Sequence, residues 1–130
     1  MAFSDYLEDK LLKHTFTNTA FTPPTTLYVG LFTAAPSDTG GGTEISTSST
    51  GYARQTATFA VSGTSPTEAN ISSAIDFPTA QADWGTITHL AVFDASTGGN
   101  MLAFSAATTS KTVATGDILL LLERLLYPLC

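Results

Sequence analysis

Asp38-Thr39-Gly40 is the stretch of this sequence that most directly suggests catalysis. The same tripeptide carries the catalytic carboxylate of aspartic proteases, in which two such groups share one proton and activate water. One copy per chain would require a homodimeric site. Here the tripeptide follows Ala-Ala-Pro-Ser, and Gly41 and Gly42 come next, so the ordered apolar surroundings of a catalytic aspartate are missing. We therefore predict that Asp38 lies at the tip of a glycine-rich loop, and a dimeric aspartic protease using Asp38 is the remote alternative.

Asp83, His89 and Asp94 form a second set that could do acid–base chemistry. If residues 84–94 form a strand, His89 and Asp94 point to opposite faces because they are five positions apart. Asp83 and His89 share a parity but lie about 20 Å apart along such a strand, at about 3.3 Å per residue. No Gly-x-Ser-x-Gly elbow accompanies the set. We predict that His89 is a strand residue facing water or a neighbouring subunit, and that the chain is not an enzyme.

Metal and cofactor motifs are also missing from the sequence. The two histidines and the one cysteine are too far apart for zinc-ligand spacing, and the acidic residues do not alternate as in a calcium loop. The glycine-rich stretches at 38–43 and 96–100 lack the lysine and the following helix of a phosphate-binding loop. We predict no metal and no cofactor.

The composition limits the kinds of partner. Charged residues make up 12% of the 130 residues, about half the usual share, and the net charge is −6. The five basic residues are scattered, which excludes the basic stripe that nucleic-acid binding needs. The N-terminus is too acidic for a signal peptide, and the apolar run at 118–130 is too short and too interrupted to span a bilayer. Cys130 is the one cysteine, so an internal disulfide is excluded. We expect a soluble chain that contacts neither nucleic acid nor membrane.

A helix is predicted over residues 5–14, within an N-terminal helical segment at 1–16. Ser4 is a typical N-cap, and acidic residues in the first turns with Lys13 and His14 in the last complement the helix dipole. Leu7 and Leu11 lie one turn apart and form a short apolar stripe. His14 is interpreted as a solvated residue at the helix end.

The rest of the chain has the pattern of short strands with frequent turns. In the stretch 26–33, Val29 and Leu31 alternate with Tyr28 and Phe32, so both faces are apolar, as in a central buried strand. The sequence predicts a mainly β fold: one domain over 1–130, a β-sandwich (jelly-roll-like) with one short N-terminal α-helix. Strands are expected at 26–33, 52–61, 70–78, 84–94, 100–106, 110–114 and 117–122, with hairpins at 95–99 and 115–116.

The apolar C-terminal tail at 118–130 has more leucines than one strand can bury. Those beyond Arg124 would form an adhesive patch in water, so we expect residues 125–130 to pack against another chain. The candidate subunit-docking residues are Leu125, Leu126, Tyr127, Leu129, Leu7 and Leu11.

Several segments together resemble a family of small virion proteins of tailed bacteriophages, often labelled tail-fibre or minor structural proteins. They are "MAFSDYLEDKLLKHTF", "TTLYVGLFTAAPSDTGGGTE", "GYARQTATF", "ADWGTITHLAVFDASTGGNMLAF" and "TTSKTVATGD". The resemblance covers about residues 1–118. It implies a non-enzymatic component of the virion, assembled in the host cytoplasm.

The resulting hypothesis is a tail-associated module of a fibre or baseplate that could contact a host surface receptor. It would bind other virion proteins and form a homo-oligomer such as a trimer. One alternative is a head decoration or cement protein that stabilises the capsid. Another is a carbohydrate-binding module, whose stacking platforms would come from aromatic residues, although Tyr28 and Trp84 are better explained as core. These aromatic candidates are Tyr6, Tyr28, Tyr52, Trp84 and Tyr127.

Overall fold

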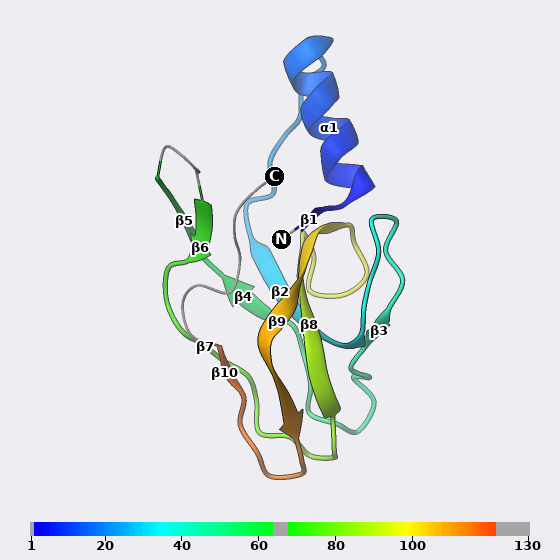
Figure 1. Ribbon diagram of the computed structural model, residues 1–130, viewed down its shortest axis with the longest axis vertical. Helices are drawn as coiled ribbons and strands as arrows, with labels where there is room; N and C mark the ends of the chain where they lie inside the picture. The colour runs from blue at the N-terminus through cyan, green and yellow to red at the C-terminus, as the bar shows by residue number, and fades with distance from the viewer. Residues whose placement is uncertain (1, 64–67, 122–130) are drawn as a thin grey trace.

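A six-stranded antiparallel sheet forms the larger layer of the computed structural model, which describes residues 2–63 and 68–121 (Figure 1). Its order is β1-β9-β8-β2-β3, and β4 also pairs with β2. The central strands are long and mostly apolar, and the edge strands are two or three residues long, which limits pairing with other chains. The bounds are β1 (Ala2–Phe3), β2 (Leu27–Ala34), β3 (Thr43–Glu44), β4 (Gln55–Ala57), β8 (Gly85–Phe93) and β9 (Met101–Val113).

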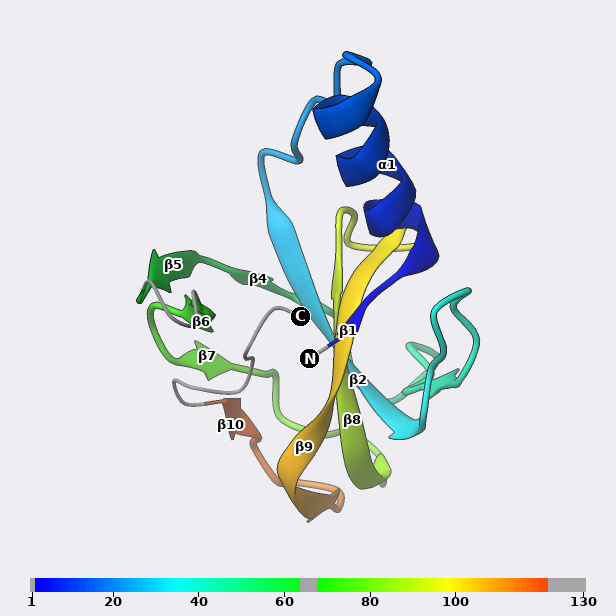
Figure 2. The same cartoon turned by 45° about the horizontal axis from the view of Figure 1, so that its top comes forward.

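Two small antiparallel sheets form a second layer on one side of the main sheet (Figure 2). One pairs β5 (Phe59–Ser62) with β6 (Glu68–Ile71), and the other pairs β7 (Ile75–Asp76) with β10 (Leu120–Leu121). The mainly β fold with one short N-terminal helix is therefore confirmed. The two layers face each other across a shared core, although the second layer consists of two short ribbons.

The core lies between these layers, and β2 is buried on both faces as the sequence predicts. Val29 and Leu31 join the main cluster with residues of the second layer such as Ile75 and Phe77. On the opposite face Phe32 belongs to a smaller cluster with Phe93 and Met101. Burial of apolar surface at about 25 cal/mol per Å² makes the main cluster the chief source of stability.

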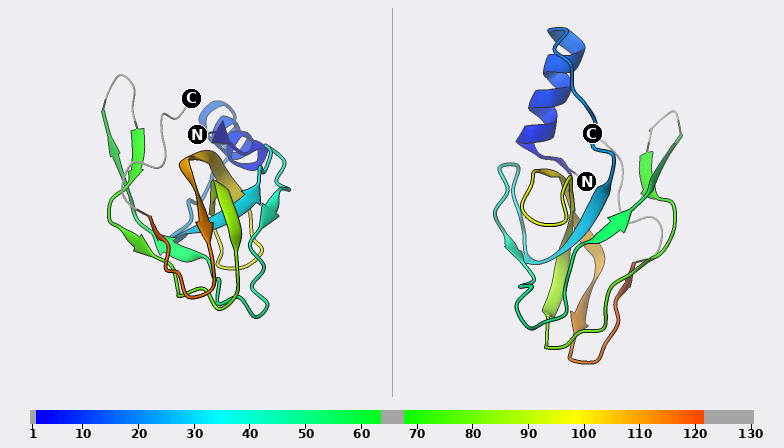
Figure 3. Two further views of the ribbon diagram at one scale, coloured as in Figure 1. Left: turned by 60° about the horizontal axis from the view of Figure 1, so that its bottom comes forward. Right: turned by 180° about the vertical axis from the view of Figure 1, so that it is seen from behind.

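Helix α1 (Asp5–Phe16) projects from the end of the main sheet rather than lying across a face of it (Figures 1 and 3). The predicted helix and its cap are confirmed, because the Leu7 backbone N–H donates to the Ser4 hydroxyl at 3.2 Å. The helix runs two residues beyond the predicted end and closes with the Thr17 N–H donating to the Lys13 carbonyl at 3.1 Å. No residue of α1 is buried.

Several strand boundaries differ from the sequence prediction. The expected strand at 52–61 is divided into β4 and β5, and the one at 70–78 is interrupted by a bend after Ile71. Ile71, Ile75 and Phe77 are nevertheless all buried, and Asp76 is exposed, as the alternation requires. The stretches 100–106 and 110–114 are parts of one continuous strand, β9.

The hairpin predicted around Thr115-Gly116 is wrong, because the strands before and after this turn do not pair with each other. The turn is present, with the Asp117 N–H donating to the Ala114 carbonyl at 3.0 Å. β9 pairs with β8, whereas the chain after the turn crosses to the second layer and pairs with β7, Leu120 opposite Asp76. The reason is burial: this route brings Leu121 into the main core cluster, which a hairpin in the first layer would not do.

Candidate functional site

The base of helix α1 is fixed to the body by backbone contacts. The Ser4 N–H donates to the Leu102 carbonyl, and the Asp5 N–H donates to the Asp38 carbonyl, both at 2.8 Å. The Ser4 hydroxyl also donates to the Met101 carbonyl, and Ser4 is the buried polar residue at this junction. The helix therefore leaves the sheet in a defined direction.

Beyond its base, α1 exposes apolar side chains. Leu12 is 56% exposed and Phe16 is 77% exposed. Of the two docking residues predicted on the helix, Leu7 packs with Tyr6 against Val92 and Leu102 of its own sheet, whereas Leu11 remains 37% exposed. The two predicted residues therefore differ: Leu7 contributes to holding the helix on the sheet, and Leu11 is exposed.

A shallow depression of about 270 Å³ lies beside the lower half of this exposed side. Its lining residues are Phe3, Glu8, Leu11 and Leu12. Apart from one carboxylate, these side chains are apolar.

The docking residues predicted in the C-terminal tail, Leu125, Leu126, Tyr127 and Leu129, lie outside the residues that the structure describes. Their docking role stays a prediction.

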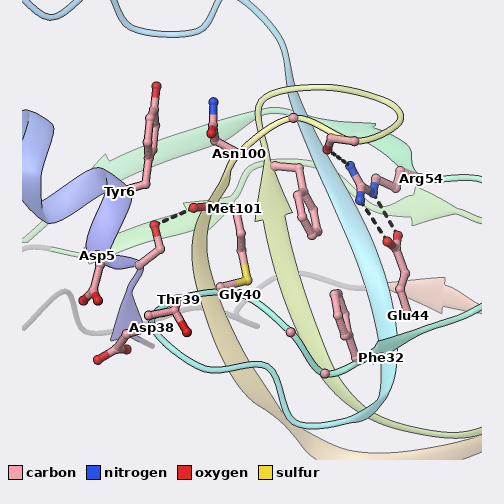
Figure 4. Close-up of a pocket in the computed structure, with 16 residues that line it drawn as sticks. Asp5, Tyr6, Phe32, Asp38, Thr39, Gly40, Glu44, Arg54, Asn100 and Met101 are labelled. Atoms are coloured by element: carbon pink, nitrogen blue, oxygen red, sulfur yellow. Dashed lines mark hydrogen bonds and ion pairs between the residues drawn. The ribbon is translucent and has the colours of Figure 1, made fainter.

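Asp38 lies in an exposed turn that is closed by a bridge between Ser37 and Gly40. The turn borders a larger pocket of about 540 Å³ between the helix base and the loops at 37–42 and 98–101 (Figure 4). Asp38 and Asp5 lie across this pocket from Arg54 and Glu44, and their side chains point outward. The prediction that Asp38 is a loop residue is confirmed.

An ion pair that the sequence analysis missed lies at the opposite wall of the same pocket. Arg54 donates from Nε and Nη2 to the two carboxylate oxygens of Glu44, each at 2.8 Å. Its Nη1 donates to the carbonyls of Ala95 at 3.0 Å and Gly98 at 2.9 Å, and its guanidinium lies 3.5 Å from the Phe93 ring centroid. Arg54 thereby ties β3 to the loop between β8 and β9 (Figure 4).

Tyr52 extends this network into the core. Its hydroxyl donates to Glu44 at 2.6 Å and accepts from the Leu31 N–H at 3.0 Å. Burial, and then the hydrogen bond to Glu44, raise the pKa of Tyr52 far above its usual value. The Tyr52 ring packs edge-on against Trp84, with centroids 5.5 Å apart, so this network is part of the structural framework.

The aromatic residues considered as sugar-stacking platforms are mostly covered. Trp84 is 4% exposed, as expected for a core residue, and its indole N–H donates to the Thr50 carbonyl at 2.9 Å. Tyr52 is buried as well, whereas Tyr6 and Tyr28 are half-buried. Tyr127 lies outside the described residues.

Asp83, His89 and Asp94 bind separate partners. Asp83 accepts from the N–H and the hydroxyl of Thr115, at 2.9 and 3.1 Å, and these hydrogen bonds lower its pKa. Asp94 accepts from the Asn100 N–H at 2.7 Å and closes the turn between β8 and β9. His89 Nδ1 lies 2.9 Å from the Thr88 hydroxyl. The hydrogen bonds of these three residues therefore lead to three different places in the fold.

Among residues 2–63 and 68–121, which the structure describes, no three or more His, Cys, Asp or Glu side chains are grouped so that they could hold a metal ion. No helix in these ranges has the length and hydropathy needed to cross a membrane.

The fold is mainly β with one exposed N-terminal helix, and the comparison with protein families identifies the group. Residues 2–125 match the family described as podophage GP4 fiber I protein gp80, and the chain belongs to this family. The resemblance to tailed-phage virion proteins is confirmed, and the chain has a structural, tail-associated role in a phage particle. A search of curated proteins gave no match.

Proposed function

We propose that this protein is a non-enzymatic module of a phage tail fibre that attaches to neighbouring virion proteins through apolar side chains. The match of residues 2–125 to a fibre family carries the proposal. The exposed leucines and Phe16 of α1 support it, because a soluble monomer gains nothing by holding such side chains in water. The helix would be one attachment surface and the tail at 125–130 another.

The structural use of the carboxylates in the body supports a non-enzymatic role. Glu44 is engaged by Arg54, Asp83 holds Thr115 in the turn after β9, and Asp94 closes the turn between β8 and β9. We expect phage particles made with Asp38→Asn to assemble, mature and infect as the wild type does. Incorporation of the variant accompanied by a failure of proteolytic maturation would support the aspartic protease instead.

The tail is tested by deleting residues 125–130. The leucines removed would each contribute about 1.5–3 kcal/mol to a subunit contact if fully buried there. We expect the truncated protein to fold and stay soluble but to enter particles poorly. Unfolding of the truncated chain, with a stable monomeric full-length protein, would place these residues in the core of their own domain.

A host surface receptor is the proposed external partner of the loops at 37–42 and 96–100. These loops consist of small polar residues and glycines, and they border the large pocket. Loops carried on a rigid sheet are common binding elements.

The decisive experiment is gold labelling of intact particles with an antibody to this protein, combined with its copy number by quantitative mass spectrometry. We expect label on the tail and a low copy number. Label over the capsid, with many copies per particle, would show a head decoration or cement protein.

A further inference from the structure

The pocket of about 540 Å³ at the base of α1 has the size of a small-molecule site, since such sites measure about 300–1,000 Å³. Its sides are formed by the start of α1 and by the loops at 37–42 and 98–101 (Figure 4). Backbone hydrogen bonds join these segments: the Asp5 N–H donates to the Asp38 carbonyl, and the Ser4 N–H donates to the Leu102 carbonyl, both at 2.8 Å. The pocket is therefore already formed in the folded chain.

The floor of this pocket is apolar. Phe32 and Phe93 stack with ring centroids 6.1 Å apart and planes 8° from parallel, and Met101 joins them in one buried cluster. The Arg54 guanidinium lies 3.5 Å from the Phe93 ring centroid and so contributes to holding that ring in place. All three apolar side chains also line the pocket, so they present a small, rigid apolar surface to a ligand.

The rim of the pocket is polar and offers both donors and acceptors. Among residues 2–63 and 68–121, the backbone N–H groups of Gly41 and Gly99 find no acceptor. Asn100 donates from Nδ2 to Asp94 at 3.1 Å, which leaves its Oδ1 as an acceptor, and the exposed Thr39 carries a hydroxyl. A ligand that fits this rim must itself donate and accept hydrogen bonds.

The charges around the pocket favour a neutral ligand. Three carboxylates and one guanidinium line it, a net charge of −2, which repels anions. A bound cation would also lack a partner inside, because the side chains of Asp5 and Asp38 point outward (Figure 4). The third carboxylate, Glu44, already accepts two hydrogen bonds from Arg54 at 2.8 Å.

We propose that this pocket binds one neutral sugar ring. A hydroxyl group both donates and accepts, so a ring that carries several of them satisfies the N–H groups and the oxygens of the rim together. The C–H groups of the same ring cover the apolar floor, which is the usual division of labour in a small-molecule site. The inference rests on the proposed contact of the loops at 37–42 and 96–100 with a host surface, and it names the chemical class of the ligand.

Amide NMR of the full chain, titrated with glucose, galactose, mannose and N-acetylglucosamine, tests the ligand class. We expect at least one of these sugars to shift the signals of Gly41 and Gly99 in a saturable way. The uronic acid of that sugar should bind at least about tenfold more weakly, because its carboxylate meets the negative rim. No shift with any of the four sugars overturns the proposal, and so does a uronic acid that binds equally well or more tightly.

Two threonine variants test the position of the site. Thr39→Trp places a large side chain at the rim and should abolish the shifts. Thr79→Trp is the matched control, because Thr79 is exposed after β7 and does not line the pocket. Asp38→Asn should also bind the sugar, since its side chain points outward. Binding that survives Thr39→Trp overturns the site, as do wild-type shifts confined to amides outside the two loops, a result that does not depend on the folding of any variant.

Adsorption of phage particles to host cells distinguishes a surface glycan from a free sugar as the source of the ring. Particles with Thr39→Trp should adsorb more slowly than particles with Thr79→Trp, and the free sugar should compete. Equal adsorption of the two, together with lost sugar binding in Thr39→Trp, would exclude the surface glycan. A protein that labels the phage tail but binds no sugar refutes this site and not the fibre role, whereas label away from the tail refutes the fibre role even where the sugar binds.

Discussion

The body of the molecule and helix α1 each contain an ion pair, in opposite environments. Arg54 and Glu44 have side chains that are 8% and 23% exposed, and Arg54 also binds two loop carbonyls. Lys13 and Asp9 on the helix meet at 3.1 Å with side chains 55% and 50% exposed. The first pair joins distant segments of one chain, whereas the second adds little to a helix that the body does not cover.

Two phenylalanines show the same contrast. Phe77 is 2% exposed and stacks on Tyr52 in the main core, and Phe16 is 77% exposed at the end of α1. The β body buries most of its large apolar side chains within one chain, whereas the helix leaves Phe16 exposed, and we propose that a partner covers it. Substitutions should therefore affect folding in the body and association in the helix.

The largest effect on stability is expected for Phe77→Ala. Removing this ring leaves a cavity in the main core and should lower the free energy of unfolding by about 4 kcal/mol. Phe16→Ala, the same change at an exposed site, should alter it by less than about 0.5 kcal/mol in the monomer. Urea unfolding followed by the fluorescence of Trp84, which is buried, measures both. An equal loss of unfolding free energy in the two variants would contradict the claim that the body and the helix differ in burial.

A somewhat smaller effect is expected for Arg54→Met. It leaves the Glu44 carboxylate in a largely buried position without its cation and releases the loop at 95–98. We expect a loss of about 3 kcal/mol, the low end for a broken buried pair, because Glu44 keeps some contact with water. Lys13→Met, which breaks the exposed pair, should cost at most about 0.5 kcal/mol. The two thermal unfolding curves should differ clearly, and overlapping curves would mean that the buried pair is not important for stability.

Gly30→Ala should cost about 2 kcal/mol, because the strand passes very close to Glu44 there. An added Cβ would lie 2.8 Å from Glu44 Oε2 and 3.2 Å from the Tyr52 hydroxyl. The clash with Glu44 predicts coupling between the two positions: the cost should fall when Gly30→Ala is made together with Glu44→Ala. Additive losses in this double-mutant cycle would show that the carboxylate is not the obstacle.

The smallest effect is a pH dependence at Asp83. Its pKa in the folded protein is lowered by the hydrogen bonds from Thr115, so the ionised carboxylate stabilises the fold. That contribution is complete above the pKa of about 3.9 in the unfolded chain and disappears as the pH falls through the lower folded value. Asp83→Asn should therefore be less stable than the wild type at neutral pH, and the gap should close in acid. A gap that stays constant across this range contradicts the assignment.

Features with local causes could be predicted from the sequence. The helix follows from Ser4 as N-cap and from the order of charges along one short segment. The burial of β2 on both faces follows from its apolar alternation, and the exposure of Asp38 follows from the glycines after it. None of these depends on a partner distant in the sequence.

Features that depend on distant partners could not be predicted in the same way. The turn at Gly116 is visible in the sequence, but the pairing of β10 with β7 is decided by the burial of Leu121 in the shared core. Likewise Glu44 and Arg54 are separated by an irregular loop, and their contact depends on Tyr52 and on a glycine at position 30 of the neighbouring strand. Arg54, one of two arginines in a chain with five basic residues, was the available signal.

Hydrogen–deuterium exchange of the full-length protein at low and at high concentration tests the central claim most directly. The account predicts that amides of the β body are protected equally at both concentrations, whereas amides of α1 beyond Leu7 gain protection as the chain associates. Strong protection of these helix amides in the monomer, unchanged at high concentration, would show that the body alone stabilises α1 and would contradict the account.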